Sequence, residues 1–335
     1  MRLALIGATG VVGGTILRVL EERNVPVDTL LAYASRARDE GVTFRGATIP
    51  VAAASRERLL ADRPDVAFFA SSDEASAELV NDLVAQGTVV IDNTSTFRLD
   101  PRVPLVIPEV NPHAIHPQHR LFPVANCTAI VLCVALAPIE REIGLRAVRA
   151  ATYQAVSGAG RAGLDALLGE EQGAASNGTF AAPIHRNVVP LVGSGDGDGD
   201  SGEEQKVAAE LRKMLERPDL HVAATTVRVP VMRAHSAAVF FETEQATTLA
   251  ELRAALRTGE GLVYHEHGIV TPRDVEDTDV VHVARLRPEP DDATDTLYQL
   301  WVVGDQLRKG AATNGVQILE LLLAQGRFAA SEVAG

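Results

Sequence analysis

The chain has 335 residues, which at about 150 residues per domain predicts two domains and excludes a disulfide-stabilised miniprotein. Apolar residues make up 46% and charged residues 22%, proportions typical of folded globular proteins, so wholesale disorder is excluded as well. The net charge of −13 disfavours nucleic acid and anionic lipid as partners, although a local basic pocket still allows a small anionic substrate.

Two features of the sequence concern the compartment. The apolar runs all fall short of the roughly 18 residues that span a bilayer, and the apolar start of the chain leads into a glycine turn instead of a signal-peptide cleavage site. Cys127 and Cys133 lie six residues apart in one apolar run, which is poor disulfide geometry if that run is helical. We therefore expect a cytoplasmic protein.

The first 125 residues alternate short apolar runs with segments of helical spacing, as in a parallel α/β sheet covered by helices on both faces. The predicted strands are residues 3–6, 30–34, 66–70, 89–91 and 105–107, and the predicted helices are residues 15–23, 55–62 and 75–86.

From about residue 126 the pattern is that of an α+β domain. An apolar stretch at 127–143 is followed by predicted strands at 148–155, 225–231, 237–242 and 297–303, and by a helix at about 313–325. The glycine- and aspartate-rich segment 193–202 predicts a flexible acidic loop. A calcium loop fails on spacing, because Ser201 and Val207 stand where the glycine and the bidentate glutamate belong, and no metal site is predicted.

A glycine-rich turn follows the first predicted strand and opens the first helix. Glycines let the backbone approach a pyrophosphate, and the helix N-terminus supplies N–H donors and positive potential. The context favours dinucleotide binding over a merely tight turn. The predicted binding residues of this turn are Gly7, Thr9, Gly10, Val11, Val12 and Gly13.

The end of the second predicted strand indicates which dinucleotide binds. A site for NAD usually carries an acidic residue about 20 residues after the glycines, whereas the first acid here is Asp39. Ser35, Arg36 and Arg38 precede it, and a hydroxyl with guanidinium groups suits a 2′-phosphate. We predict NADP; the alternative is that both arginines are solvated surface charges.

Cys127 lies where a predicted strand gives way to a polar turn and then to an apolar helix. A helix N-terminus stabilises a thiolate, so Cys127 is a candidate nucleophile, although a lone cysteine is more often a small buried hydrophobe. Cys133, between apolar neighbours, is predicted to be inert core.

Other segments support the chemical interpretation of Cys127, and in their order along the chain they resemble the aspartate-β-semialdehyde dehydrogenase family over nearly the whole length. Besides the glycine turn and Gln154, they are NTSTFR (93–98), PEVNP (108–112), NCT (126–128), NVVP (187–190), EEQK (203–206), RVPVMRAH (228–235) and LRKGAATN (307–314).

The resemblance implies a Rossmann-type parallel sheet domain joined to an α+β catalytic and dimerisation domain, an architecture like that of glyceraldehyde-3-phosphate dehydrogenase. The NADP-binding domain is expected at 1–125, completed by a C-terminal helix within 313–335 that returns to it. The catalytic and dimerisation domain is expected at 126–312, and the protein is expected to be a homodimer.

The resemblance also implies roles for individual residues. Cys127 would accept the acyl group, Gln154 would orient it and His235 would be the acid/base. Among the residues that would bind the substrate, Arg228 would bind its α-carboxylate, Glu203 its ammonium group, and Arg98 and Lys206 its phosphate. Asn126 would also contact the substrate. The cofactor would be contacted by Ser71, Ser72, Gly158 and Asn314. Alternatively, the charged residues are ordinary surface charges and His235 is a hydrogen-bonded histidine of the core. Glu204 is a second candidate for the role of Glu203.

The implied reaction is NADPH-dependent reductive dephosphorylation of L-4-aspartyl phosphate to L-aspartate 4-semialdehyde through a cysteine thioester. Reduction of another acyl phosphate or a coenzyme A thioester is one alternative, and a non-catalytic NADP-binding protein is another. Ala125 and Gln306 depart from the family's usual proline and asparagine, which puts fine positioning in question, and the acidic loop before Glu203 is expected to weaken anion binding nearby.

Overall fold

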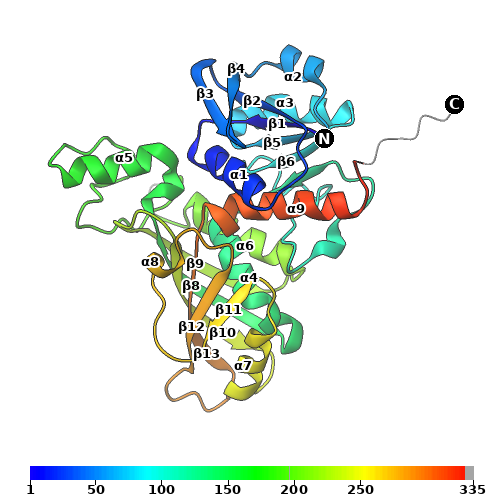
Figure 1. The fold of residues 1–335 in the computed structure, drawn as a ribbon. Coiled ribbons are helices and arrows are strands. Elements are labelled where there is room, and N and C mark those ends of the chain that lie inside the picture. The colour runs from blue at the N-terminus through cyan, green and yellow to red at the C-terminus, as the bar shows by residue number, and fades with distance from the viewer. Residues whose placement is uncertain (196, 329–335) are drawn as a thin grey trace. The chain divides into compact units, whose positions relative to one another are not determined.

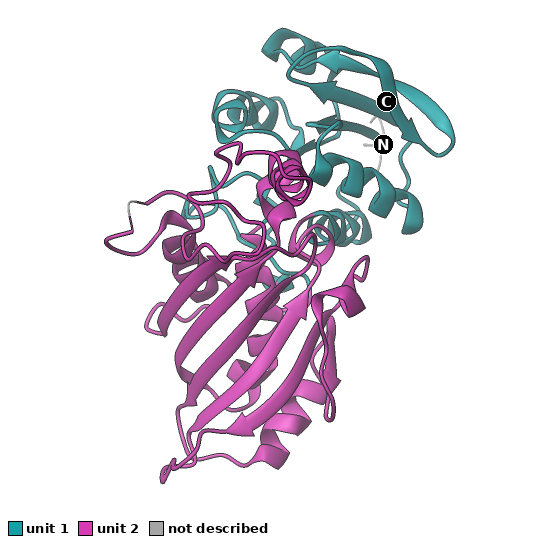
Figure 2. Cartoon of the chain, turned by 90° about the vertical axis from the view of Figure 1, so that its left-hand side faces the viewer, with its two compact units in different colours: residues 1–108, 112–124, 312–335 teal, residues 109–111, 125–311 magenta. Residues whose placement is uncertain are grey.

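The structure, a computed structural model, describes residues 1–195 and 197–328. The chain forms two compact units (Figure 2). The first unit comprises residues 1–108, 112–124 and the chain from Ala312 onward, and the second comprises residues 109–111 and 125–311. Residue 196 of the predicted acidic loop lies outside the described residues.

The first unit contains a seven-stranded sheet in the order β3-β4-β2-β1-β5-β6-β7 (Figure 1). The strands are β1 (Arg2–Ile6), β2 (Thr29–Ala34), β3 (Arg38–Phe44), β4 (Ala47–Ala53), β5 (Val66–Phe69), β6 (Val89–Asp92) and β7 (Leu121–Pro123). Neighbouring strands are parallel except for the antiparallel pair β3 and β4. With β1 between β2 and β5, the order is that of a Rossmann-type sheet.

Helices cover both faces of this sheet, namely α1 (Val11–Glu22), α2 (Arg56–Asp62), α3 (Asp73–Ala85) and α9 (Thr313–Ala324). Alternate side chains of β5 face opposite layers, as the period of a strand requires. Phe69 belongs to a buried cluster with Leu79 of α3, whereas a Cβ added to Gly315 of α9 would lie 3.2 Å from the Phe68 ring. The helix α9 also contacts α1 and β6, so the C-terminal helix returns to the first sheet as predicted.

Two predicted strands differ from the structure, and one hairpin was not predicted. Residues 105–107 form no strand; they are buried in an irregular segment, because a continuous apolar run signals burial but not pairing. The β3–β4 hairpin was missed because its first strand starts with charged, exposed residues at a sheet edge. The strand predicted to reach residue 231 ends at Arg228, shortly before Pro230, which cannot donate to a ladder.

The second unit contains a six-stranded mixed sheet in the order β11-β12-β13-β10-β8-β9. The strands are β8 (Leu145–Gln154), β9 (His221–Arg228), β10 (His235–Thr243), β11 (Leu262–His265), β12 (Val281–Pro288) and β13 (Leu297–Gly304). Helices of this unit are α4 (Cys127–Glu142), α5 (Gly160–Glu171), α6 (Gly202–Met214), α7 (Leu249–Arg257) and α8 (Pro272–Val275). The apolar α4 packs against β8, β10, β12 and β13 and against α6 and α7, which places the core of the unit on one face of the sheet (Figures 1 and 2).

Candidate active site

The site in the second unit is built around the first turn of α4, where Cys127 lies half-buried. Asn126 caps this helix: its Oδ1 accepts from the N–H groups of Thr128 (2.9 Å) and Ala129 (3.0 Å). The first turn itself holds no acidic residue, so no carboxylate within that turn offsets the partial positive charge that the helix N-terminus places near Cys127. Cys133 is fully buried in the same helix, and burial raises the pKa of its thiol, which agrees with its predicted role as core.

Glu203, at the start of α6, joins this cap to the end of β8. Its Oε1 accepts from Asn126 Nδ2 and from Gln154 Nε2, both at 2.9 Å. Gln154 Nε2 also donates to Thr128 Oγ1 at 2.5 Å. The other amide atom, Gln154 Oε1, is buried and has no hydrogen-bond partner among the described residues.

The neighbouring Glu204 has a different task. Its side chain forms a capping box with Ser201 at the N-terminus of α6 and accepts from the N–H of Thr226 at 2.7 Å. The structure therefore places Glu203, and not Glu204, against Asn126 and Gln154.

The ends of three adjacent strands supply the other polar groups. Gln154 ends β8 and pairs in register with Arg228, which ends β9, while His235 begins the antiparallel β10. Arg228 Nη1 donates to the carbonyl of Ala155 at 2.6 Å, and the N–H of Ala155 donates to His235 Nδ1 at 3.0 Å. The backbone of Ala155 thus orients both the guanidinium of Arg228 and the imidazole of His235.

His235 and Arg228 are both deeply buried and incompletely hydrogen-bonded. His235 Nε2 and Arg228 Nε have no partner among the residues that the structure describes, and the Phe180 ring lies 5.5 Å from the guanidinium carbon. Burial, followed by the positive charge of Arg228, lowers the pKa of His235 well below 6.5. Burial also lowers the pKa of Arg228, against the opposing influence of Cys127 and Glu203.

Close approach in this region requires two glycines. A Cβ on Gly158 would lie 2.8 Å from Arg228 Nη1 and 3.1 Å from His235 Nε2. A Cβ on Gly310 would lie 3.1 Å from the Cβ of Cys127. Gly310 belongs to a π-helical turn (Arg308–Ala312), in which the buried Lys309 pairs with Glu109 at 2.6 Å.

The two residues predicted to bind phosphate lie in different units. Lys206 is half-buried on α6, one turn from Glu203, and forms no hydrogen bond or ion pair within the described part of the chain. Arg98 belongs to the first unit, where its Nη2 donates to the carbonyl of Asn93 at 2.9 Å.

The predicted cofactor residues, apart from Gly158, lie in the first unit. The turn from Gly7 to Gly13 follows β1, Ser35 and Arg36 follow β2, and Ser71 and Ser72 follow β5. These are the carboxyl ends of adjacent parallel strands, where dinucleotides bind in such sheets. Asn314 is fully buried in α9 and donates to the carbonyl of Val106 at 3.0 Å.

The geometry of these strand ends fits a dinucleotide. Gly7 has φ +91°, and a Cβ there would lie 2.1 Å from the Ala70 carbonyl oxygen. The first turn of α1 has no side-chain cap and no acidic residue, which leaves its N–H groups and positive potential to an anion. Ser71 Oγ is buried without a hydrogen-bond partner among residues 1–195 and 197–328, and Arg36 is exposed after β2.

Sequence reasoning missed Glu210 as part of the site. It is completely buried, and its Oε2 accepts from the backbone N–H of Asn126 at 2.5 Å. Glu203 and Glu210 lie two helical turns apart on α6, and that spacing, which puts both carboxylates on one helix face, is the signal that could have found it.

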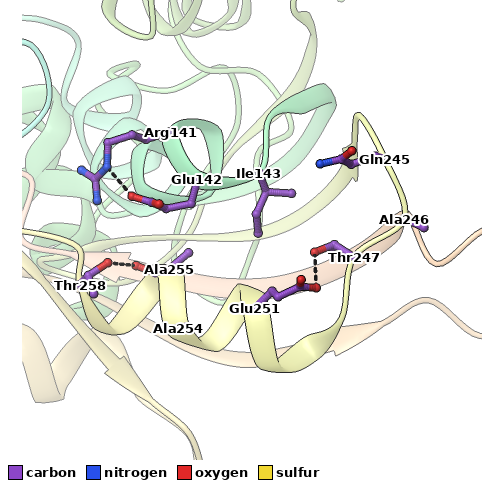
Figure 3. A pocket seen from close by; sticks show the side chains of 10 residues that line it. All are labelled: Arg141, Glu142, Ile143, Gln245, Ala246, Thr247, Glu251, Ala254, Ala255 and Thr258. Carbon is purple, nitrogen blue, oxygen red and sulfur yellow. Dashed lines mark hydrogen bonds and ion pairs between the residues drawn. The ribbon is translucent and has the colours of Figure 1, made fainter.

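A separate pocket of about 460 Å³ opens at the far end of α4 (Figure 3). It is lined by Arg141, Glu142, Ile143, Gln245, Ala246, Thr247, Glu251, Ala254, Ala255 and Thr258. The predicted site residues do not line it. Over the described ranges, the helices are all too short or too polar to cross a bilayer.

The fold and the site define a class: dehydrogenases in which a Rossmann-type domain is combined with a mixed-sheet domain that carries a cysteine at a helix N-terminus. Two family patterns match the chain. "Semialdehyde dehydrogenase, NAD binding domain" covers residues 2–118, and "Semialdehyde dehydrogenase, dimerisation domain" covers residues 136–309.

Similar proteins narrow the class. The chain is 39% identical to the aspartate-semialdehyde dehydrogenase of Aquifex aeolicus over 97% of this chain and 98% of the relative, and 38% identical to that of Streptomyces akiyoshiensis over 97% and 99%. The crystal structure of aspartate semialdehyde dehydrogenase II from Vibrio cholerae complexed with ASA has a TM-score of 0.89 at 38% identity, covering 96% of this chain and 98% of that one. The chain belongs to the aspartate-semialdehyde dehydrogenase family, as its motifs predicted.

Proposed function

We propose that the protein catalyses the NADPH-dependent reductive dephosphorylation of L-4-aspartyl phosphate to L-aspartate 4-semialdehyde. The observation that carries the proposal is the convergence of Gln154, Arg228 and His235 from three adjacent strand ends in the unit whose helix α4 begins at Cys127. In this proposal residues 1–125 with the C-terminal helix bind the dinucleotide, and residues 126–312 carry catalysis and dimerisation.

Cys127 is the nucleophile of the proposed reaction. Its thiolate attacks the acyl carbon, the bond from that carbon to the phosphate oxygen breaks, and phosphate leaves with the bonding electron pair, so that a thioester forms on Sγ. When bound, the reduced dinucleotide supplies a hydride to this carbon. The oxyanion that results expels the Cys127 thiolate and leaves the aldehyde.

His235 serves as a hydrogen-bond donor in the proposed mechanism. Since the Ala155 N–H occupies Nδ1, the neutral imidazole holds its proton on Nε2, whose donor has no partner among the described residues. That N–H stabilises the negative charge that develops on the substrate oxygen in each tetrahedral intermediate. Hydrogen-bond donation is thus our proposal for His235, whereas the family resemblance implied a role as the acid/base.

Substrate recognition in the proposed reaction relies on four charged side chains and one amide. Arg228 grips the α-carboxylate, and its burial strengthens the interaction because water competes less. Glu203 selects the ammonium group. Gln154 orients the acyl group through its unpartnered Oε1, and Lys206 and Arg98 bind the phosphate.

NADP is the proposed cofactor, because Ser35 and the exposed Arg36 stand where a site for NAD carries an acid. Arg36 forms no hydrogen bond or ion pair among the described residues, so its guanidinium remains available to a 2′-phosphate.

A homodimer is proposed through the face of the second sheet opposite α4. Large side chains stand on this face: Tyr153 is 37% and Phe240 36% exposed, and Trp301 lies 5.6 Å from the Tyr153 ring. A second copy would cover these apolar groups, and the matched dimerisation pattern includes all three residues.

The test is a comparison of the wild type with Cys127→Ala. The variant should lose phosphate-dependent reduction of NADP by aspartate semialdehyde while it still binds NADP, measured by calorimetry. Undiminished turnover in the variant would refute the proposed role of Cys127 as the nucleophile. Malonyl-CoA assayed in parallel distinguishes an acyl phosphate from a thioester substrate, and a wild type that is inactive with both would indicate a non-catalytic NADP-binding protein.

A further inference from the structure

Gln306 links two segments that carry site residues. It is 2% exposed and lies between β13 and the π-helical turn. Its Oε1 accepts from the N–H of Ala234 at 2.8 Å, and its Nε2 donates to Ser157 Oγ at 2.6 Å. Ser157 Oγ in turn donates to the carbonyl of Met232 at 2.5 Å. The Gln306 amide therefore bridges the residue before His235 and the turn that contains Gly158.

Ala234 adopts an unfavourable backbone conformation at this point. Its φ is +68°, in the left-handed region, where a side chain with a Cβ is disfavoured by about 5- to 30-fold relative to the right-handed region. Ala234 is fully buried and directly precedes His235. The direction in which the His235 ring leaves the backbone therefore depends on keeping Ala234 in this conformation.

We propose that Gln306 is a positioning residue that holds Ala234 left-handed and thereby aims the Nε2–H of His235 at the reacting oxygen. The expected effect on catalysis rests on the proposed function, whereas the positioning of Ala234 and His235 by Gln306 does not. One side-chain amide makes both connections: Gln306 Oε1 bonds to Ala234 and Gln306 Nε2 to Ser157.

The proposal predicts different consequences for His235 and for Arg228. Arg228 is oriented by its bond to the Ala155 carbonyl and does not contact Gln306 through a hydrogen bond in the described residues. Loss of the Gln306 amide should therefore misplace His235 and lower kcat, while carboxylate binding by Arg228, and with it KM, changes little.

The experiment compares wild type, Gln306→Met, Ala234→Gly and the double variant. Methionine keeps the volume and removes the amide, and glycine adopts φ +68° without penalty. We expect Gln306→Met to lower kcat by about 10-fold or more with KM within about 3-fold, and Ala234→Gly in that background to restore about 5-fold or more. Gln245→Met, at an exposed loop residue, is the matched control and should keep the wild-type kcat.

Two results would overturn the proposal. The first is a wild-type kcat in Gln306→Met. The second is a folded double variant whose kcat is no higher than that of Gln306→Met, because a residue that acts only through packing would not respond to the removal of the backbone strain at Ala234. If Gln306→Met does not fold, Ser157→Ala, which removes one partner of the amide, is assayed with and without Ala234→Gly, and the same two results decide.

A readout without turnover keeps this test distinct from that of the proposed function. The imidazole ¹⁵N signals of His235, assigned by their loss in His235→Gln, should show Nε2 protonated in the wild type, exchange-broadened signals in Gln306→Met, and recovery in the double variant. Identical signals in wild type and Gln306→Met would refute the positioning role. An inactive wild type with the expected signals would refute the proposed function alone.

Discussion

The backbone N–H of Ala155 donates to Nδ1 of His235 at 3.0 Å, and this single bond assigns the proton of the neutral imidazole to Nε2. The carbonyl of the same Ala155 accepts from Arg228 at 2.6 Å. The segment that follows β8 thus sets both the tautomer of the histidine and the position of the guanidinium.

The first prediction concerns stability against pH. Because burial and the charge of Arg228 lower the pKa of His235 well below 6.5, the unfolded chain binds a proton there at pH values where the folded chain does not. The free energy of unfolding should therefore fall as pH drops below about 6.5, by up to about 1.4 kcal/mol per pH unit from this group. Urea unfolding from about pH 5 to 8 should show a shallower dependence for His235→Gln than for wild type.

His267, which is exposed, provides the control for this measurement. His267→Gln should keep the wild-type pH dependence. An unchanged dependence in His235→Gln would show that His235 takes up its proton equally in the folded and unfolded states.

The second prediction separates Glu203 from Glu204. Glu203→Ala should raise KM for aspartate semialdehyde by about 10- to 100-fold, because a charged acceptor for the ammonium is lost. Glu204→Ala should instead cost about 1 kcal/mol of stability through the lost capping box while KM stays within about 2-fold of wild type. Steady-state kinetics and urea unfolding of both variants check it; the reverse pattern would assign the ammonium to Glu204.

The third prediction concerns the dinucleotide. Arg36→Glu should weaken NADP binding by about 10- to 100-fold, because a charge-assisted bond to the 2′-phosphate is replaced by repulsion. Binding of NAD should be unchanged or stronger. Arg102→Glu, at an exposed residue that pairs with Asp100, is the control and should bind both dinucleotides like the wild type. Equal loss of NAD and NADP in Arg36→Glu would argue against recognition of the 2′-phosphate.

The fourth prediction concerns assembly. Phe240 lies opposite Arg149 and Gln299 in the register of the central strands and points to the open face of the sheet. Phe240→Lys should shift the protein from dimer to monomer in sedimentation velocity, because a buried unpaired ammonium is costly. Leu99→Lys, at an exposed position of the first unit, should leave the sedimentation unchanged. A dimer that persists in Phe240→Lys places the interface elsewhere.

Local patterns predicted much of the fold. Continuous apolar runs made β1, β2, β5, β6 and the helix α4 recognisable, because elements that are buried on all sides consist mainly of apolar residues. The glycine turn was recognisable because glycine permits a close approach of the backbone to another group. The β3–β4 hairpin was missed because it is polar and lies at an edge, and residues 105–107 were wrongly predicted as a strand because burial alone does not imply a pairing partner.

The motifs of the chain were enough to indicate a cysteine nucleophile at a helix start, a dinucleotide turn and the family to which the protein belongs. Adjacent residues such as Glu203 and Glu204 are equivalent in a sequence pattern, and they became distinct only when α6 took one as its cap and turned the other toward Asn126. The same holds for Gln306, which bonds to Ala234, 72 residues away in the sequence. A hydrogen bond between distant segments produces no periodic pattern in the sequence. It forms only after β13 and β10 have paired and brought the two residues together.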